Sequence, residues 1–129
     1  MFAGPMSGGG GTSADAAAVI VGAAGDMAGW SVATGDPNGD DAVDLLIGLP
    51  GSATAGAGSG AVSLTYGPVS SGSTAAADVI IEGSVSGEAL GHSLSAGGDV
   101  DGDAYVDVVL GAPDSGGTGA TYLFLGRGL

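Results

Sequence analysis

The stretch DPNGDDAVD, residues 36–44, places oxygen-bearing side chains at its first, third, fifth and ninth positions. The stretch DVDGDAYVD, residues 99–107, repeats this spacing 63 residues later (99 − 36 = 63). Both stretches run directly into short apolar segments, LLIG from residue 45 and VVLG from residue 108. Two acidic loops at equivalent places before equivalent apolar segments predict a repeated structural unit.

The likeness extends to both sides of the loops. GWSVATG from residue 29 matches GHSLSAGG from residue 91, GAVSLTYG from residue 60 matches GATYLFLG from residue 119, and AAAVIVGA from residue 16 matches AADVIIEG from residue 76. The offsets differ by a few residues, and such shifts belong in loops, which tolerate insertions. We therefore expect a flexible lead over residues 1–14 and one unit over residues 15–129. Its two repeats cover about residues 16–75 and about residues 76–128.

The matched apolar segments are short, rich in Val, Ile, Leu, Tyr or Thr, and bounded by Gly, Pro, Asp or Ser. This composition is typical of strands, and no segment keeps a helical period. We expect an all-β fold with small-residue loops over residues 51–60 and 68–76. The expected strands lie near residues 17–22, 29–34, 43–48, 61–66, 78–82, 91–96, 106–110 and 120–125.

The chain is strongly acidic, with 14 Asp and Glu against 1 Lys or Arg, and a formal net charge of -13. It lacks the cationic groups that replace phosphate counterions, which argues against nucleic-acid binding, and an anionic membrane surface would repel it. Eight of the acidic residues lie in the two loops, so the charge points to divalent cations as partners. With 44% apolar residues, the composition does not predict disorder.

The sequence gives little sign of a covalent or membrane-bound role. It has no cysteine, which excludes disulfides, thiolate zinc sites and a cysteine nucleophile. No apolar run approaches the ~20 residues of a membrane span, and no secretory signal is visible at the N-terminus.

The two loops are suited to calcium, which takes six to eight oxygen ligands at ~2.3–2.6 Å. Alternate side chains of a tightly wound loop can point inward, a carbonyl at the seventh position can add a ligand, and the ninth residue can close the site from the next strand. A dication would also relieve the repulsion among the carboxylates. We expect two calcium ions per chain. The predicted ligands are Asp36, Asn38, Asp40, Ala42 through its carbonyl and Asp44 in the first loop, and Asp99, Asp101, Asp103, Tyr105 through its carbonyl and Asp107 in the second.

Two alternatives compete with this interpretation. An EF-hand needs Gly at the sixth position and Glu at the twelfth, whereas these loops have Asp41 and Ala104, then Ile47 and Leu110. The other alternative is a pair of solvated acidic turns without a metal. One acidic turn would be compatible with it, but two at matching positions argue against it.

The order of these motifs resembles the FG-GAP repeat of integrin-α-type β-propellers. LGHSL from residue 90 and VLGAP from residue 109 match it closely, whereas the first repeat is looser, with Ala28-Gly29 and Gly48-Leu49-Pro50. The resemblance covers about residues 16–127. It implies a four-stranded blade per repeat, with calcium bound between the first two strands by the loop residues named above. The family usually has Gly at the sixth loop position, from which Asp41 and Ala104 depart.

Two blades would leave outer apolar faces uncovered, and propellers have ~4–8 blades. The segment at 17–22 matches the outermost strand of a blade, and the last blade lacks that strand. We therefore expect either a fragment of a longer propeller or a homo-oligomeric ring of three or four chains. In the ring, residues 17–22 of one chain would pair with residues 121–125 of the next, so that the outer strand is swapped.

Catalysis has few candidate residues. His92 is the only histidine and occupies the place of Trp30 in the first repeat, which is typical of a packing position or a rim contact. We expect Trp30 to be buried between blades, and we do not expect an enzyme. The predicted function is a calcium-binding structural, adhesion or recognition module, extracellular or at the cell surface, with a protein or glycan as its ligand. The alternative is an accessory propeller fragment of a larger exported hydrolase.

Overall fold

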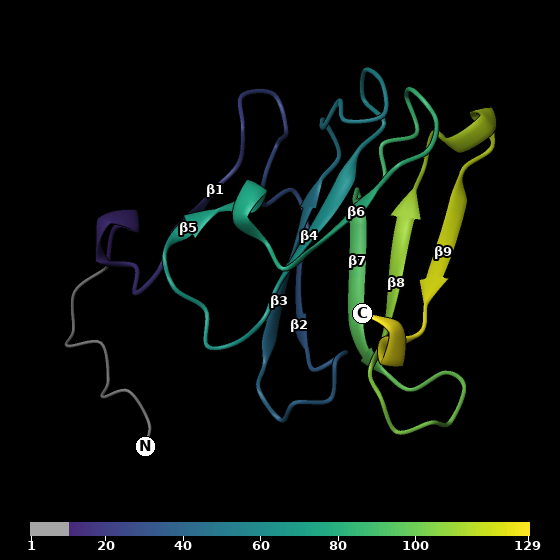
Figure 1. The fold of residues 1–129 in the computed structure, drawn as a ribbon. Coiled ribbons are helices and arrows are strands. Elements are labelled where there is room, and N and C mark those ends of the chain that lie inside the picture. The colour runs from purple at the N-terminus through teal and green to yellow at the C-terminus, as the bar shows by residue number, and fades with distance from the viewer. Residues whose placement is uncertain (1–10) are drawn as a thin grey trace.

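The structure is a computed structural model that describes residues 11–129. Two antiparallel sheets dominate it (Figure 1). The four-stranded sheet has the order β2 (Val32–Gly35), β3 (Asp44–Leu49), β4 (Ala61–Thr65), β6 (Val79–Glu82), and the three-stranded sheet has the order β7 (Ser93–Gly98), β8 (Asp107–Ala112), β9 (Ala120–Phe124). The remaining elements are β1 (Ile20–Val21), β5 (Gly72–Ser73) and the 3-10 turns η1 (Ser13–Asp15), η2 (Thr74–Ala76), η3 (Ser115–Gly117) and η4 (Gly126–Gly128).

This arrangement confirms the expected all-β fold. Each of the eight expected strands has a counterpart with bounds shifted by up to three residues, although the first is reduced to two residues, and β5 was not expected. Of the expected lead, residues 1–10 lie outside the described residues, and η1 begins at Ser13. Within residues 11–129, none of the helical turns has the length and apolar character needed to cross a membrane.

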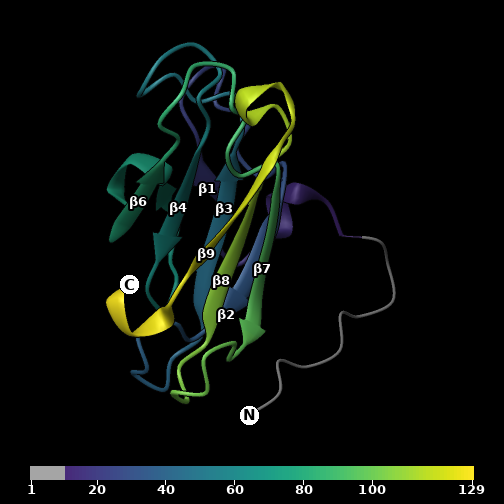
Figure 2. The same ribbon diagram turned by 90° about the vertical axis from the view of Figure 1, so that its right-hand side faces the viewer.

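The two sheets pack face to face around one core. Figures 1 and 2 show β2 and β7 side by side, with the other strands of each sheet fanning away from them. Gly48 of β3 is needed at this contact, because a Cβ atom there would lie 2.1 Å from the carbonyl oxygen of Gly91. The buried core consists of Leu46, Val62 and Leu64 from the first sheet, Val108, Leu110 and Ala112 from β8 of the second, and Leu90 from the segment before β7.

The sheets meet through different faces. Leu46 of β3 corresponds in the repeat to Val109 (46 + 63 = 109), but the β8 residues in the core are Val108 and Leu110. Successive side chains of a strand point to opposite faces, so one face of the first sheet contacts the opposite face of the second. This head-to-tail arrangement is the one that repeated blades adopt around an axis, and it is consistent with β-propeller blades.

The strand expected at residues 17–22 differs from its prediction. Only Ile20–Val21 forms a strand, and it pairs in parallel with Gly72–Ser73 of its own chain. Ile20 packs on the outer face of the first sheet against the buried Ile47, Leu49 and Ala61. The structure therefore does not show the swapped strand: Ile20–Val21 pairs within its own chain, Ile20 covers part of an apolar face there, and no strand pairs with the outer edge of β9 within the described residues.

A buried carboxylate holds the second sheet to the turn that precedes it. Glu88 is 1% exposed and accepts hydrogen bonds from the backbone amides of Ser84 (2.8 Å) and Val85 (3.1 Å). It also accepts from the hydroxyl groups of Tyr122, on β9, and Ser115. The hydrogen bond from Tyr122 is the main cause that lowers the pKa of Glu88.

We predict that Tyr122→Phe destabilises the protein by about 1.5–3 kcal/mol at pH 7, the usual size for a hydrogen bond to a charged group. The folded pKa of Glu88 is lowered, so the stability it contributes is present above its unfolded pKa and is lost as the pH falls through the folded value. The loss caused by Tyr122→Phe should therefore shrink at acid pH. Urea unfolding at pH 7 and at pH 3 measures both values.

Tyr66→Phe is the matched control, because the Tyr66 hydroxyl makes no hydrogen bond to the described residues although its ring packs on the same core. Equal losses for Tyr122→Phe at the two pH values would contradict the assigned role of Glu88.

Candidate metal centres

The first loop, residues 36–44, is wound around the side chain of Asp36. Asp36 Oδ1 accepts hydrogen bonds from the backbone amides of Gly39 (2.7 Å) and Asp40 (3.1 Å), and Oδ2 accepts from the amide of Asp41 (2.9 Å). Asn38 Oδ1 accepts from the amide of Asp40, and Asp40 Oδ1 accepts from that of Ala42. Asx side chains that bond their own following backbone hold the loop in a tight turn.

The second loop, residues 99–107, repeats these bonds one for one. Asp99 Oδ1 accepts from the amides of Gly102 (2.6 Å) and Asp103 (3.0 Å), and Oδ2 accepts from Ala104 (2.9 Å). The amide of Asp103 also donates to Asp101 Oδ1, and that of Tyr105 donates to Asp103 Oδ1. The similarity of the loops in sequence is therefore a similarity in geometry.

The structure shows how Asp41 and Ala104 fit the sixth loop position, where FG-GAP repeats usually have Gly. Asp41 and Ala104 have φ angles of 66° and 75°, in the left-handed region where Gly is usual. This conformation costs a residue with a side chain roughly 1–2 kcal/mol. The amide of each residue donates to the first aspartate of its loop, so the turn keeps its geometry without Gly.

The ninth position joins each loop to its sheet. Asp44 and Asp107 are the first residues of β3 and β8, and they are 0% and 2% exposed. Asp44 Oδ1 accepts from the amide of Gly67, and Asp107 Oδ1 accepts from that of Gly126, both at 2.9 Å. These donors were not predicted, although a signal was present: Gly67 and Gly126 close the matched segments from residues 60 and 119.

Three of the predicted ligands of the second loop converge, and Asp103 is not among them. One carboxylate oxygen from each of Asp99, Asp101 and Asp107 lies within 4.8 Å of the others. Two ligands on opposite sides of a calcium ion are about 5 Å apart, twice the bond length, so one ion can contact all three. Burial raises the pKa of Asp101, and the charges of Asp103, Asp107 and Asp99 add to this, whereas backbone hydrogen bonds, first that of Ala104, lower the pKa of Asp99.

The first loop carries an unsatisfied oxygen. Asp44 Oδ2 is buried and has no hydrogen-bond partner among the described residues. Burial is also the main cause that raises the pKa of Asp44, with the charges of Asp40, Asp36 and Asp78 contributing. A buried acceptor without a donor is costly, and a cation is the natural partner for one among carboxylates. The oxygen-only donor set and this free oxygen fit a calcium ion.

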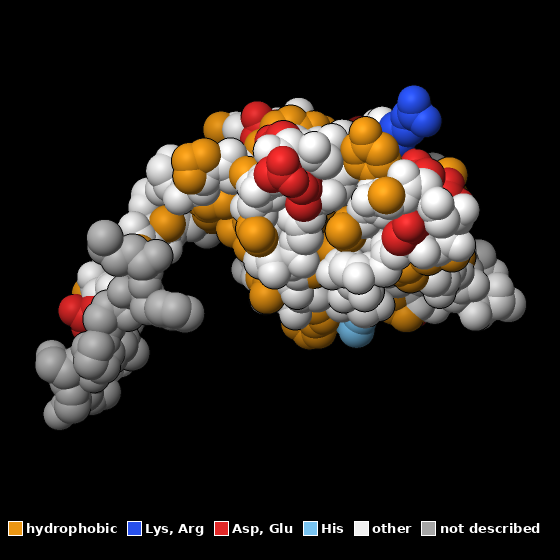
Figure 3. Space-filling view, turned by 90° about the horizontal axis from the view of Figure 1, so that it is seen from below, with side chains coloured by type: hydrophobic (Ala, Val, Ile, Leu, Met, Phe, Trp, Pro, Cys, Tyr) orange, Lys and Arg blue, Asp and Glu red, His pale blue; other side chains and the backbone are white. Residues whose placement is uncertain are grey.

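Both loops lie at the same end of the molecule. Figure 3 views that end, where the side chains of Asp and Glu gather on the surface. In Figure 1 the two loops are the turns at the bottom, between β2 and β3 and between β7 and β8.

Comparison with known families identifies part of the chain that contains the second loop. Residues 90–124 match the family model of the FG-GAP repeat. The chain carries an FG-GAP repeat. The match runs from Leu90 to the end of β9 and includes the whole second loop. No curated protein matches the chain.

The aromatic pair at the other end of the sheets corrects one prediction. Trp30 is 57% exposed rather than buried, and its ring centroid lies 5.3 Å from that of His92. The turn before β2, in which the amide of Trp30 donates to the carbonyl of Met27, places the indole at the end of the sheet and outside the interface. Together with Asp114, these residues line a hollow of about 360 Å³.

The loops also contact one another. A Cβ atom on Gly39 would lie 2.3 Å from the ring of Tyr105, whereas one on the equivalent Gly102 would meet nothing within 4 Å. Both glycines have left-handed φ angles, 74° and 82°. The pair therefore separates the cost of backbone strain from the cost of contact between loops.

We predict that Gly102→Ala destabilises the protein by about 1 kcal/mol through backbone strain alone. Gly39→Ala should cost more, because the ring of Tyr105 must also move. Thermal unfolding of both variants measures the difference. Equal losses would show that the contact between Gly39 and Tyr105 contributes nothing to stability.

Proposed function

We propose that the chain is a calcium-binding module of the β-propeller type that binds one ion in each loop. The observation that carries this is Asp44 Oδ2, which is buried at the closing position of an all-oxygen loop and has no hydrogen-bond partner within residues 11–129. The matching hydrogen bonds of the second loop, which lies inside the FG-GAP repeat, support it.

A bound ion would supply positive charge where the carboxylates converge. It would link the loop aspartates to Asp44 or Asp107 and so join two adjacent strands at their shared end. The role is structural and electrostatic, and we propose no catalysis.

The biological setting we propose is adhesion or recognition outside the cell. FG-GAP repeats are typical of extracellular and cell-surface proteins. The exposed Trp30 beside His92 supports a contact site for a protein or glycan ligand, because aromatic faces are common anchors in such contacts. An accessory role in a larger exported hydrolase differs in one respect: the isolated chain would then have no ligand of its own.

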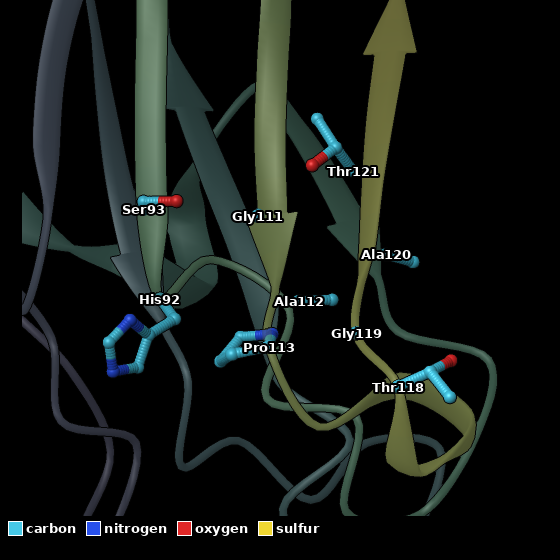
Figure 4. Close-up of a pocket in the computed structure, with 9 residues that line it drawn as sticks. All are labelled: His92, Ser93, Gly111, Ala112, Pro113, Thr118, Gly119, Ala120 and Thr121. Atoms are coloured by element: carbon cyan, nitrogen blue, oxygen red, sulfur yellow. The ribbon is translucent and has the colours of Figure 1, made fainter.

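The outer face of the second sheet supports assembly with further copies. Ser93, Gly111 and Thr121 lie in register across β7, β8 and β9 and line a shallow hollow of about 480 Å³ (Figure 4). The corresponding face of the first sheet, with Gly48 and Val62, is the one that the second sheet covers. We propose that the first sheet of another copy covers this face head-to-tail, giving a ring of three or four chains.

Closure of such a ring requires a rearrangement of the N-terminal segment. Ile20 now covers the outer face of the first sheet, which would have to become available. The segment is held by a two-residue parallel ladder and by a hydrogen bond from the amide of Val19 to the Ser71 hydroxyl. These few bonds make its release a small cost compared with burying a sheet face.

We predict two calcium sites per chain by isothermal titration, with Mg²⁺ a poor substitute because it demands tighter octahedral geometry. Calcium that binds only the folded state raises the free energy of unfolding by about 2.7 kcal/mol per site when its concentration is a hundred times Kd. Asp40→Ala and Asp103→Ala should each remove one site and lower the melting temperature in calcium, with much less effect in chelator. No binding at millimolar calcium would overturn the proposed function, and equal losses in both conditions would assign these residues to packing.

We predict that Leu123→Asp keeps the protein monomeric. Leu123 is 47% exposed on the open face and corresponds to Leu64, which the neighbouring sheet buries completely (123 − 59 = 64). Val85→Asp adds the same charge at another exposed position and should leave assembly unchanged. Light scattering in calcium measures the mass. A wild-type chain that stays monomeric at high concentration would contradict the ring.

A further inference from the structure

The two loops differ in one backbone hydrogen bond to a loop aspartate, and in a side-chain bond from Asn38 Nδ2 to Asp40 Oδ2 that only the first loop has. In the second loop, the backbone amide of Val100 donates to Asp107 Oδ2 at 2.6 Å. The corresponding residue of the first loop is Pro37 (100 − 63 = 37), which has no amide hydrogen to donate. The oxygen that this bond would satisfy, Asp44 Oδ2, is the one without a partner among the described residues. The other backbone bonds to the loop aspartates occur in both loops.

Asp44 is shielded from bulk solvent. Asp44 is 0% exposed, and Pro37 is itself among the fully buried side chains. A buried charged oxygen without a donor keeps its full desolvation cost. A cation that binds Asp44 removes this cost, whereas at Asp107 the amide of Val100 has already removed part of it, so the ion gains less there.

We propose that the residue at the second position of each loop, Pro37 or Val100, sets the calcium affinity of that loop. Pro37 leaves Asp44 Oδ2 without a donor, so the ion relieves the full desolvation cost of that oxygen, whereas the amide of Val100 already relieves part of this cost at Asp107. This inference rests on the proposed function and adds to it a residue that contacts no ion. The loops also differ in charge, because the third position is Asn38 in the first loop and Asp101 in the second. The inference therefore compares variants of one loop with each other and does not compare the affinities of the two loops.

The experiment restores or removes the donor in each loop. Pro37→Val and Pro37→Ala, in an Asp103→Ala background that leaves only the first loop able to bind, both supply an amide hydrogen at position 37. We expect each to weaken calcium binding by about tenfold, the effect of one hydrogen bond. Val100→Pro in an Asp40→Ala background removes the donor from the second loop and should strengthen binding by a similar factor.

Val100→Ala is the control, because it keeps the amide, and it should leave the affinity within twofold. Isothermal titration compares the metal-free and metal-bound folded states, so the effect of proline on the unfolded chain does not enter the dissociation constant. Amide proton shifts of the metal-free protein give a second measurement. A hydrogen-bonded amide should appear at position 37 in Pro37→Val, as at Val100 in the wild type.

Three outcomes separate the inference from the proposed function. If the wild type binds no calcium, both are wrong. If it binds calcium but Pro37→Val and Pro37→Ala leave the affinity of the first loop unchanged, only this inference is wrong. The same conclusion follows if the amide at position 37 shows no hydrogen bond. If Val100→Pro does not fold, the two Pro37 variants decide the question alone.

Discussion

The burial of one aspartate at the start of each central strand is the constraint on which the rest of the structure depends. Asp44 and Asp107 lie where the loop ends and the sheet begins, and both are almost fully buried. A buried carboxylate requires hydrogen-bond donors. The amides of Gly67, after β4, and Gly126, after β9, supply them. The aspartate thus joins the acidic loop, the strand that it begins and the segment that ends at Gly67 or Gly126. A change in the conformation of the loop therefore acts directly on the sheet.

The sequence predicts the parts of this structure that depend on local pattern. Short apolar segments between Gly, Pro and Asp predict the strands, and the repeated spacing predicts two loops with the same winding. It does not predict where Ile20 packs or that Trp30 is exposed, because both depend on which apolar faces remain uncovered after the sheets have packed. The role of Gly67 and Gly126 was also missed, although their places in the repeat match.

The backbone of the repeat is better preserved than its residues. Asp41 and Ala104 share a left-handed conformation, and so do Met27 and Ala89 in the turns before β2 and β7. Only Gly adopts this conformation without strain, so local preference does not account for it. In the loops, the amide of the sixth residue donates to the first aspartate. In the two loops, these hydrogen bonds help to hold the sixth residue in its strained conformation.

The acidic loops and the aromatic pair lie at opposite ends of the same strands, β2 and β7. Trp30 precedes β2 and the first acidic loop follows it, and His92 and the second loop are related in the same way across β7. A strand of four residues spans about 13 Å, so an ion in the loop is too far away to contact a ligand at the aromatic end. An ion in a loop can influence that end only through the strands, and β2 and β7 lie side by side. Under the proposed function, calcium would therefore act on recognition by fixing how these two strands are held, and not by contacting the ligand itself.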